Sequence, residues 1–393
     1  MKYVNVLFLN NVVPACVVSI LSACVAIGLV LGGFLPNSDS RWCMWFGATG
    51  YLFTFIVWHC RKLVFLDISC IKQADSIQKT DAIISMGAFL KNSKSMLVFW
   101  DSTYVTRLWC VFELSGFLHS RKPNSTTELA VCPLPLGVAF VLGHVSLTLF
   151  LFVLMTLEDA MDDAWVHILV VLVLGICCFT ALAAACREYF RNVQEMQRQL
   201  TSFTCAQAKS QCCQKGHEGA RAGSLCDREI ILHCIIAWFG SVEEFELRVR
   251  NEVKTLLSQQ LADNVFTYRL FLQLGSPFFW YRLGLVPSHR EDYRKMIAEL
   301  AYVFVYCFVV YPMMFKLCVL ACAKLRTRCC SLYVDVLLSS AVVGLGAVFY
   351  VICWLVNIYV FQSPAREWDA SIVSLCMWAP IAVALWRCFP VPL

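Results

Sequence analysis

The sequence predicts a multi-pass α-helical membrane protein with about seven spans and a small cytosolic α/β unit. Three observations lead to this class. Hydrophobic residues make up 59% of the 393-residue chain, and charged residues make up only 15%, whereas roughly a quarter of a typical globular domain is charged. Several apolar stretches reach about 20 residues, the length with which a helix crosses about 30 Å of hydrocarbon. Between them lies one stretch with alternating strand and helix patterns.

The apolar stretches give the predicted spans. The first could instead be a signal peptide, but no small-residue cleavage site follows it, so we interpret it as a span. The predicted spans are 11–35, 42–60, 137–157, 164–186, 300–323, 332–361 and 370–389. The lipid bilayer is therefore the first predicted partner, although the sequence does not indicate which membrane.

The distribution of basic residues predicts the orientation, since lysine and arginine collect in cytosolic loops. The interval between the second and third spans is rich in them, whereas the loop 158–163 has none. The interval 61–135, the N-terminus and the interval 187–295 are therefore predicted to be cytosolic. Lys324, Arg326 and Arg328 would then lie outside. Either the stretch 300–323, which contains Pro312, is re-entrant, or the number of spans differs from seven.

The net charge of +5 needs no nucleic-acid partner, because cytosolic loops of membrane proteins are basic. No basic stripe with interleaved stacking aromatic residues is present. The predicted domains are two membrane helices (1–62), an α/β unit (63–135), two membrane helices (136–186), a cytosolic helical and linker region (187–298) and three membrane helices (299–393).

The α/β unit is predicted from alternating strand and helix patterns. Residues 63–67 and 96–100 are short apolar runs typical of buried strands, and 128–133 is a third run that ends at a proline. Helical spacing of apolar residues covers 76–90 and 107–119. The order strand, helix, strand, helix, strand predicts a parallel sheet with right-handed crossovers.

Ligands of such sheets bind beyond the carboxyl ends of the strands. Asp67, Asp101 and the start of the helix with Glu113 are expected at that edge, where carboxylates could serve acid/base chemistry or bind a ribose hydroxyl. The ordinary alternative is that Asp101 caps a turn and that Glu113 is a solvated helix carboxylate or a partner of Arg107.

Three segments resemble the Toll/interleukin-1 receptor (TIR) domain, especially its version in plant immune receptors. They are Phe65-Leu66-Asp67, Asp101-Ser-Thr-Tyr104 and Leu108-Trp-Cys-Val-Phe-Glu-Leu114. The resemblance covers 63–134 and implies part of a flavodoxin-like fold. The chain is also similar to multi-pass proteins of single-celled eukaryotes that carry such a truncated unit.

The resemblance implies roles for particular residues. Glu113 matches the glutamate that cleaves NAD in enzymatic members, and the loop 69–75 matches the loop that mediates assembly. The residues implied in interaction are Asp67, Ser69, Cys70, Gln73, Trp109 and Cys110. The chain departs from the family at both ends, because apolar residues 42–60 replace the first strand and helix, and a membrane span begins directly after Pro135.

These departures favour a non-enzymatic membrane protein that displays a degenerate interaction domain for signalling or self-association, with a second copy of the chain as a partner and no cofactor. The first alternative is an NAD hydrolase that uses Glu113, with NAD as its cofactor. The second is a transporter or channel, for which the candidate ionisable residues are His144, His167 and Asp335. No internal repeat supports transport.

The interval 187–298 contains four further features. Residues 187–199 are predicted to continue the fourth span as a charged helix. Cysteines and histidines occur between 205 and 234 without CxxC spacing, so no metal site is predicted. Residues 242–261 form an amphipathic helix whose apolar stripe is expected to pack on the strand-helix unit. The aromatic run 278–281 is expected to anchor the chain at the membrane interface.

Overall fold

The computed structural model describes residues 2–36, 41–59, 64–66, 70–71, 76–121, 128–158, 164–214, 216, 226–328, 331–357 and 367–388. Its contacts divide the chain into two compact units. Unit 1 contains Met1–Cys60, Pro135–Phe190 and Val265–Pro392, and unit 2 contains Arg61–Leu134 and Arg191–Asn264. The predicted boundary at 298 differs from the packing boundary at Asn264, because two short apolar helices after Asn264 pack in unit 1.

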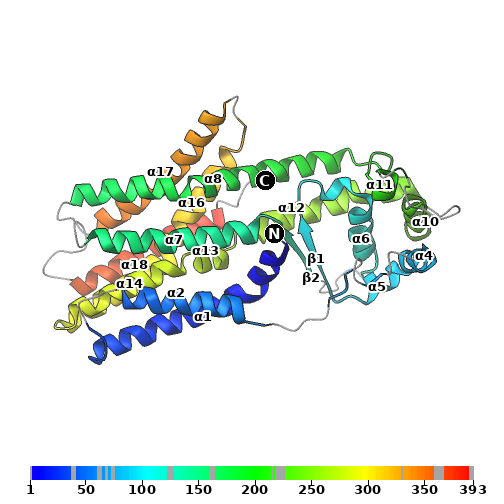
Figure 1. Cartoon of the computed structure of the whole chain (residues 1–393). Helices are drawn as coiled ribbons and strands as arrows, with labels where there is room; N and C mark the ends of the chain where they lie inside the picture. Colours follow the sequence, from blue (N-terminus) through cyan, green and yellow to red (C-terminus); the bar gives the residue numbers. More distant parts are fainter. Residues whose placement is uncertain are drawn as a thin grey trace. The chain divides into compact units, whose positions relative to one another are not determined.

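Unit 1 consists of helices (Figure 1). They are α1 (Lys2–Leu31), α2 (Trp42–Val57), α7 (Leu136–Glu158), the first part of α8 (Ala164–Thr201), α13 (Tyr268–Leu274), α14 (Ser276–Leu285), η3 (Val286–His289), α15 (Tyr293–Val305), the π-helix η4 (Tyr306–Val310), α16 (Tyr311–Lys324), α17 (Leu332–Val356) and α18 (Glu367–Cys388). The prediction of a helical membrane protein agrees with this architecture.

Among the described residues, five helices are long and apolar enough to cross a membrane. They are α1, α7, α8, the continuous run Tyr293–Lys324 and α17. The other two predicted spans correspond to shorter apolar helices, Trp42–Val57 and Ser374–Cys388. The continuation of the fourth span as a charged helix is confirmed, because α8 runs without interruption to Thr201.

Small residues bring α1 and α2 together. Ala15, Ser19 and Ala23 repeat every fourth residue of α1 and are fully buried. A Cβ atom at Gly50 of α2 would lie 2.6 Å from the Ser22 hydroxyl. Small residues at this spacing allow close backbone approach, which is how helices associate in lipid.

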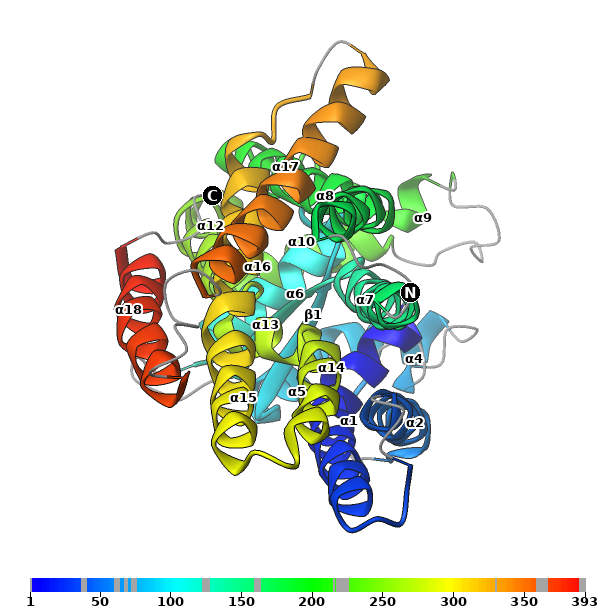
Figure 2. The same ribbon diagram turned by 90° about the vertical axis from the view of Figure 1, so that its left-hand side faces the viewer.

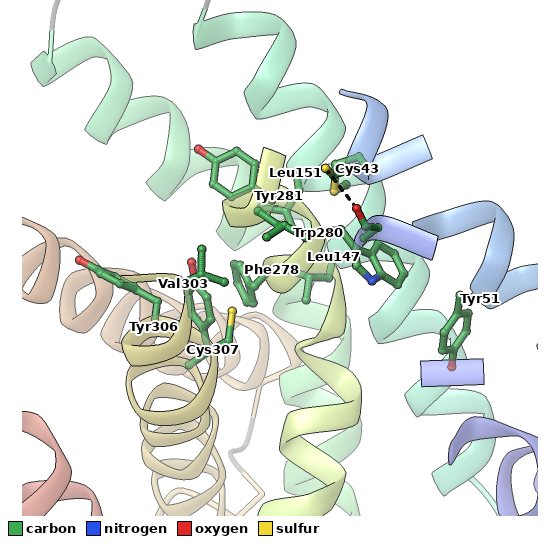
Figure 3. Packing of buried hydrophobic residues seen from close by; sticks show 14 of the residues in the cluster. Cys43, Tyr51, Leu147, Leu151, Phe278, Trp280, Tyr281, Val303, Tyr306 and Cys307 are labelled. Atoms are coloured by element: carbon green, nitrogen blue, oxygen red, sulfur yellow. Dashed lines mark hydrogen bonds between the residues drawn. The ribbon is translucent and has the colours of Figure 1, made fainter. Parts of the chain in front are cut away.

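The aromatic run at 278–281 lies in the core of unit 1, so the prediction that it anchors the chain at a membrane interface is wrong. Phe278, Trp280 and Tyr281 are buried, and Figure 3 shows them among the residues of the central cluster. A Cβ atom at Gly47 of α2 would lie 2.5 Å from the Trp280 ring. Figure 2 shows α14 beside α1, in agreement with the contacts of α14 with α1 and α2. Because these helices accept the rings, the aromatic residues pack inside the protein.

Unit 2 contains a small sheet and short helices (Figure 1). Its elements are α4 (Ser76–Ile84), α5 (Met86–Asn92), β1 (Ser95–Trp100), η1 (Tyr104–Thr106), α6 (Leu108–His119), β2 (Glu128–Pro133), the end of α8, α9 (Gln211–Gln214), α10 (Asp227–Phe239), α11 (Val242–Arg248), the π-helix η2 (Val249–Val253) and α12 (Lys254–Asp263). The helix predicted over 76–90 is interrupted at Ser85, which ends α4 and begins α5.

The parallel pairing predicted for the second and third runs is confirmed. Strand β1 pairs with β2 in parallel, with Ser95 opposite Glu128 and Trp100 opposite Pro133. The strand predicted over 63–67 is wrong in its described part, since Val64, Phe65 and Leu66 form no strand and are exposed. The Phe65 ring instead stacks on Phe89 of α5 at 4.7 Å. A short apolar run does not by itself distinguish a strand from another apolar contact.

The amphipathic helix predicted over 242–261 is confirmed as α11, η2 and α12 in succession. Its stripe is completely buried at Phe245, Val249, Val253, Leu257 and Leu261. This helix contacts α6, α10 and β2 within unit 2. The stripe therefore packs on the strand-helix unit, as expected from the sequence.

Candidate functional site

The loop after β1 is a closed polar turn. The Asp101 carboxylate accepts hydrogen bonds from the Thr103 amide at 2.7 Å and the Thr103 hydroxyl at 2.6 Å, and it pairs with Arg107 at 3.2 Å. Short polar side chains commonly stabilise turns by such local bonds. The structure therefore agrees with the ordinary alternative for Asp101, that of a turn cap.

Helix α6 positions the residues that the resemblance singled out. Glu113, Trp109 and Cys110 are each partly exposed on it. One turn before them, the buried Tyr104 donates a hydrogen bond from its hydroxyl to the carbonyl oxygen of Cys110 at 3.2 Å. Burial raises the pKa of Tyr104 well above its usual value, and the nearby Cys110 and Glu113 raise it further. Glu113 is thus close enough to Tyr104 to affect its pKa.

A segment from the interval 187–298 covers the loop before α6. The Leu108 amide donates to the Lys209 carbonyl at 3.0 Å, and the Lys209 amide donates to the Thr106 carbonyl at 2.7 Å. Arg228 of α10 fixes this segment by donating to the carbonyl oxygens of Cys205, Ala206 and Ala208 at 2.6–3.2 Å.

Glu246 of α11 adds a second attachment for the same segment. Its carboxylate accepts from the Cys205 amide at 2.7 Å and pairs with Arg250 at 2.9 Å, and Arg250 also donates to the Phe203 carbonyl. Residues 203–209 thus cover the loop before α6 and are held there by α10 and α11. Sequence reasoning missed these residues, although Glu246 and Arg250 have the spacing of a helical ion pair.

Trp238 of α10 joins the two parts of unit 2. A Cβ atom at Gly87 or at Gly116 would lie 2.7 Å from its ring, and Phe112 stacks on it at 4.7 Å. Both glycines therefore allow a close approach that any other residue would obstruct. This contact, together with the buried stripe of α11 and α12, makes unit 2 a self-contained core.

The other residues of the predicted interaction loop have different outcomes. Asp67, Ser69 and Gln73 lie outside the described residues, and Cys70 is exposed.

An exposed apolar cluster lies nearby in the sequence and consists of Val64, Phe65, Leu66 and Phe89. Their exposed fractions range from 38% to 69%. We call this set the Phe65–Phe89 patch.

The fold brings two cysteines of the interval 187–298 together. The sulfur atoms of Cys213 and Cys226 lie 3.4 Å apart, whereas Cys205 is buried elsewhere, and burial raises its pKa to about 12. His233 is bonded to the Glu229 carbonyl at 2.8 Å. Within the described ranges, no group of three or more histidine, cysteine, aspartate or glutamate residues could hold a metal ion.

The ionisable residues of unit 1 occur in three arrangements. His144 is buried and bonded to the Ser276 hydroxyl at 3.0 Å, whereas the side chain of His167 lies outside the described set. Asp335 pairs with the completely buried Arg187 at 2.9 Å. Arg282 and Glu299 form a third arrangement that sequence reasoning missed; the signal is the position of Arg282 directly after an aromatic run.

Comparison of the chain with protein-family models, with curated proteins and with solved structures gives no match in any of the three.

Proposed function

We propose that this chain is an integral membrane protein that crosses the bilayer eight times and carries unit 2 on the cytosolic side as a non-enzymatic interaction module. The observation that carries the proposal is the position of residues 203–210, which we call the covering segment. Its backbone is hydrogen-bonded to the loop that follows β1, and the Asp101 carboxylate in that loop already accepts a bond from Thr103. The exposed Phe65–Phe89 patch remains as an apolar surface of this unit.

Parallel packing of α1 and α7 supports a common side for the N-terminus and the end of segment 61–134. The Gly137 amide donates to the side-chain oxygen of Asn5 at 2.8 Å. One turn further along, the rings of Phe8 and Phe140 lie 5.0 Å apart. The two helices therefore begin at the same end of unit 1 and run in the same direction.

The eighth crossing is the broken helix pair α13–α14. These helices have 7 and 10 residues joined by Gly275, and together they extend about 27 Å at 1.5 Å per residue, close to the thickness of the hydrocarbon. They run antiparallel to α15–α16, since Phe271 is near Phe315, Phe278 stacks on Tyr311, and Arg282 pairs with Glu299. Broken helices are tolerated at membrane depth where protein surrounds them.

The Arg187 contacts explain the basic loop that contradicts a seven-span arrangement. Arg187 lies where the apolar part of α8 ends, and it donates to the carbonyl oxygens of Leu325 and Thr327. The loop after α16 therefore lies at the same end of unit 1 as the charged part of α8. With eight crossings, the Lys324, Arg326 and Arg328 loop joins the other basic intervals on the cytosolic side, as the positive-inside rule expects.

Labelling of engineered cysteines tests the eight crossings. Arg290 and Arg328 are exposed, and they lie on opposite sides of the membrane in the eight-crossing arrangement. Arg290→Cys and Arg328→Cys should therefore react with a membrane-impermeant maleimide in different compartments, as judged in intact, selectively permeabilised and fully permeabilised cells. Wild-type protein gives the background from native cysteines. Arg328→Cys labelled in the same compartment as Arg290→Cys would contradict the arrangement.

Self-association is the interaction for which we propose a direct test. Two differently tagged full-length copies should co-purify from mild detergent, and Phe89→Glu should reduce recovery at least about tenfold, because a charge buried in an apolar contact costs more than 1.4 kcal/mol. Leu247→Glu is the matched control, since Leu247 is 50% exposed on α11 of the same unit. Equal recovery for all three proteins would reject the patch as the interface.

An assay of NAD cleavage by the purified full-length protein tests the non-enzymatic function. NAD cleavage that disappears in Glu113→Gln would reject it.

A further inference from the structure

The strongest unexplained feature of unit 1 is a polar cluster around Arg282. Arg282 of α14 and Glu299 of α15 face each other with a nitrogen-oxygen distance of 3.5 Å, and both side chains are at least 84% buried. The guanidinium lies over the Tyr306 ring, 4.7 Å from its centre. The Tyr311 ring lies 5.8 Å from that of Tyr306, and Tyr350 of α17 stacks on Tyr311 and meets Tyr306 edge-on. We call Arg282, Glu299, Tyr306 and Tyr311 the Arg282 cluster.

Each member of the Arg282 cluster has a buried polar atom without a hydrogen-bond partner among the described residues. These atoms are Nε of Arg282, Oε1 of Glu299 and the hydroxyl oxygens of Tyr306 and Tyr311. Tyr306 and Tyr311 are only 2% and 1% exposed. Figure 3 shows the Tyr306 hydroxyl pointing away from Phe278 and Cys307. The Glu299 Oε1 still faces the Arg282 guanidinium at 3.5 Å. A buried polar group without a partner costs about 1–3 kcal/mol, so the remaining three atoms in one place indicate a site for a polar ligand.

Arg187 shows how this chain satisfies a purely structural arginine. Its guanidinium donates to the Leu325, Thr327 and Asp335 carbonyl oxygens and to the Ser339 hydroxyl, and it pairs with the Asp335 carboxylate, all within 2.6–3.3 Å. Arg282 has no comparable set among the described residues. Its ion pair with Glu299, at 3.5 Å, is longer than a charge-assisted hydrogen bond of about 2.7–2.9 Å.

The backbone at the cluster is irregular. The π-helix η4 begins at Tyr306, and Tyr311 directly follows it. Pro312 has no amide hydrogen, so the Phe308 carbonyl lacks its helical donor and accepts instead from the Tyr268 hydroxyl. Single-turn π-helices inside α-helices occur frequently at functional sites.

We infer that the Arg282 cluster binds a small zwitterion, with an anionic oxygen group on Arg282 and the tyrosine hydroxyls and a cationic nitrogen on Glu299. An anion alone would be repelled by the Glu299 carboxylate, and a cation alone by the guanidinium. A ligand with both charges is attracted to both and replaces the long ion pair by two shorter ones. The tyrosine rings also favour a cationic nitrogen. This chemistry occurs in free amino acids and in zwitterionic lipid headgroups.

Thermal unfolding of the purified full-length protein in a non-ionic detergent tests the inference. The probes are glycine and short-chain phosphatidylcholine, and acetate, tetramethylammonium and short-chain phosphatidylglycerol are the single-charge controls. A zwitterionic probe should raise Tm with concentration, by about 3 °C or more near saturation. A rise with glycine identifies a free solute, whereas a rise with phosphatidylcholine alone identifies a headgroup; either result supports the inference.

Variants decide whether the rise comes from this cluster. Arg282→Gln and Glu299→Gln should abolish the rise in Tm. Tyr306→Phe, which removes one oxygen atom and leaves the ring, should weaken binding about tenfold or more, the effect of a lost hydrogen bond to a charged group. Tyr189→Phe is the control, because Tyr189 is buried in the same unit and contacts Phe190 and Phe266. No rise with either zwitterion, or an equal rise in Tyr306→Phe and wild type, would overturn the inference and leave ordered water only.

Discussion

Replacing Arg187 with methionine is expected to destabilise unit 1 by about 3–5 kcal/mol, the cost of removing one partner of a buried ion pair. The side chain is completely buried and contacts five acceptor atoms. Hydrogen bonds between membrane helices average about 0.6 kcal/mol each, so five give about 3 kcal/mol. The Asp335 carboxylate, which is only 17% exposed, would in addition lose its cation. Methionine retains the length of the side chain, so the loss of polar contacts dominates the effect.

Unfolding in mixed detergent micelles, followed by tryptophan fluorescence, measures this loss of stability. Arg198→Met is the control on the same helix, because Arg198 is 74% exposed and pairs with Glu195 three residues earlier. Exposed pairs contribute at most about 1 kcal/mol. The double variant with Asp335→Asn should be more stable than Arg187→Met alone, because no uncompensated carboxylate remains. Equal stability of Arg187→Met and Arg198→Met would show that the Arg187 contacts do not hold α8, α16 and α17 together.

Arg187 also shows what the sequence could and could not predict. The end of an apolar stretch at Arg187 is visible in the sequence, and the charged continuation of α8 was predicted from it. Its partners are 138 to 152 residues away along the chain, and no periodic pattern relates such distant positions. For the same reason the basic loop at Lys324 was recognised as inconsistent with seven spans, but its position beside α8 was not predicted.

The aromatic run at 278–281 shows a different limit. Aromatic residues next to basic ones are typical of a membrane interface, and the same composition suits a packed core. Gly47 of α2 decides between the two, because a glycine there is what allows the Trp280 ring to approach. Sequence patterns describe one element at a time, whereas the fit between two elements depends on both.

Patterns within one element were more informative in unit 2. The strands at 96–100 and 128–133 and the helix at 107–119 were predicted from periodicity and from the prolines that end the last strand, and the structure has them within one residue. The run 63–67 failed, because five apolar residues fit a strand or a stacking contact such as Phe65 on Phe89. The resemblance to the TIR domain depends partly on that run and remains a prediction.

Phe245→Ala is expected to open the helix formed by α11, η2 and α12. Phe245 is completely buried and contacts Phe203 at 6.3 Å and Phe239 at 5.1 Å, so it connects the covering segment 203–210 with α10. Truncation of a buried phenylalanine costs about 3–5 kcal/mol. Hydrogen exchange of the full-length protein measures the effect locally, and the amides of 242–263 should exchange at least about 100-fold faster, since 1.4 kcal/mol is tenfold in an equilibrium constant.

Leu247→Ala is the matched control, because Leu247 is on the same helix and 50% exposed. It should change the exchange rates of the same amides less than about threefold, as surface substitutions usually shift stability by at most about 0.5 kcal/mol.

The two variants also separate packing from membrane attachment. If the apolar stripe were bound to lipid, Phe245 would act as an anchor, and Phe245→Ala would leave the amides of α6 and β2 protected. Because the stripe contacts α6, α10 and β2, protection should instead fall in these elements together with α11. Faster exchange confined to 242–263 would show that the helix formed by α11, η2 and α12 is held independently of the strand-helix unit, and that unit 2 is not one self-contained module.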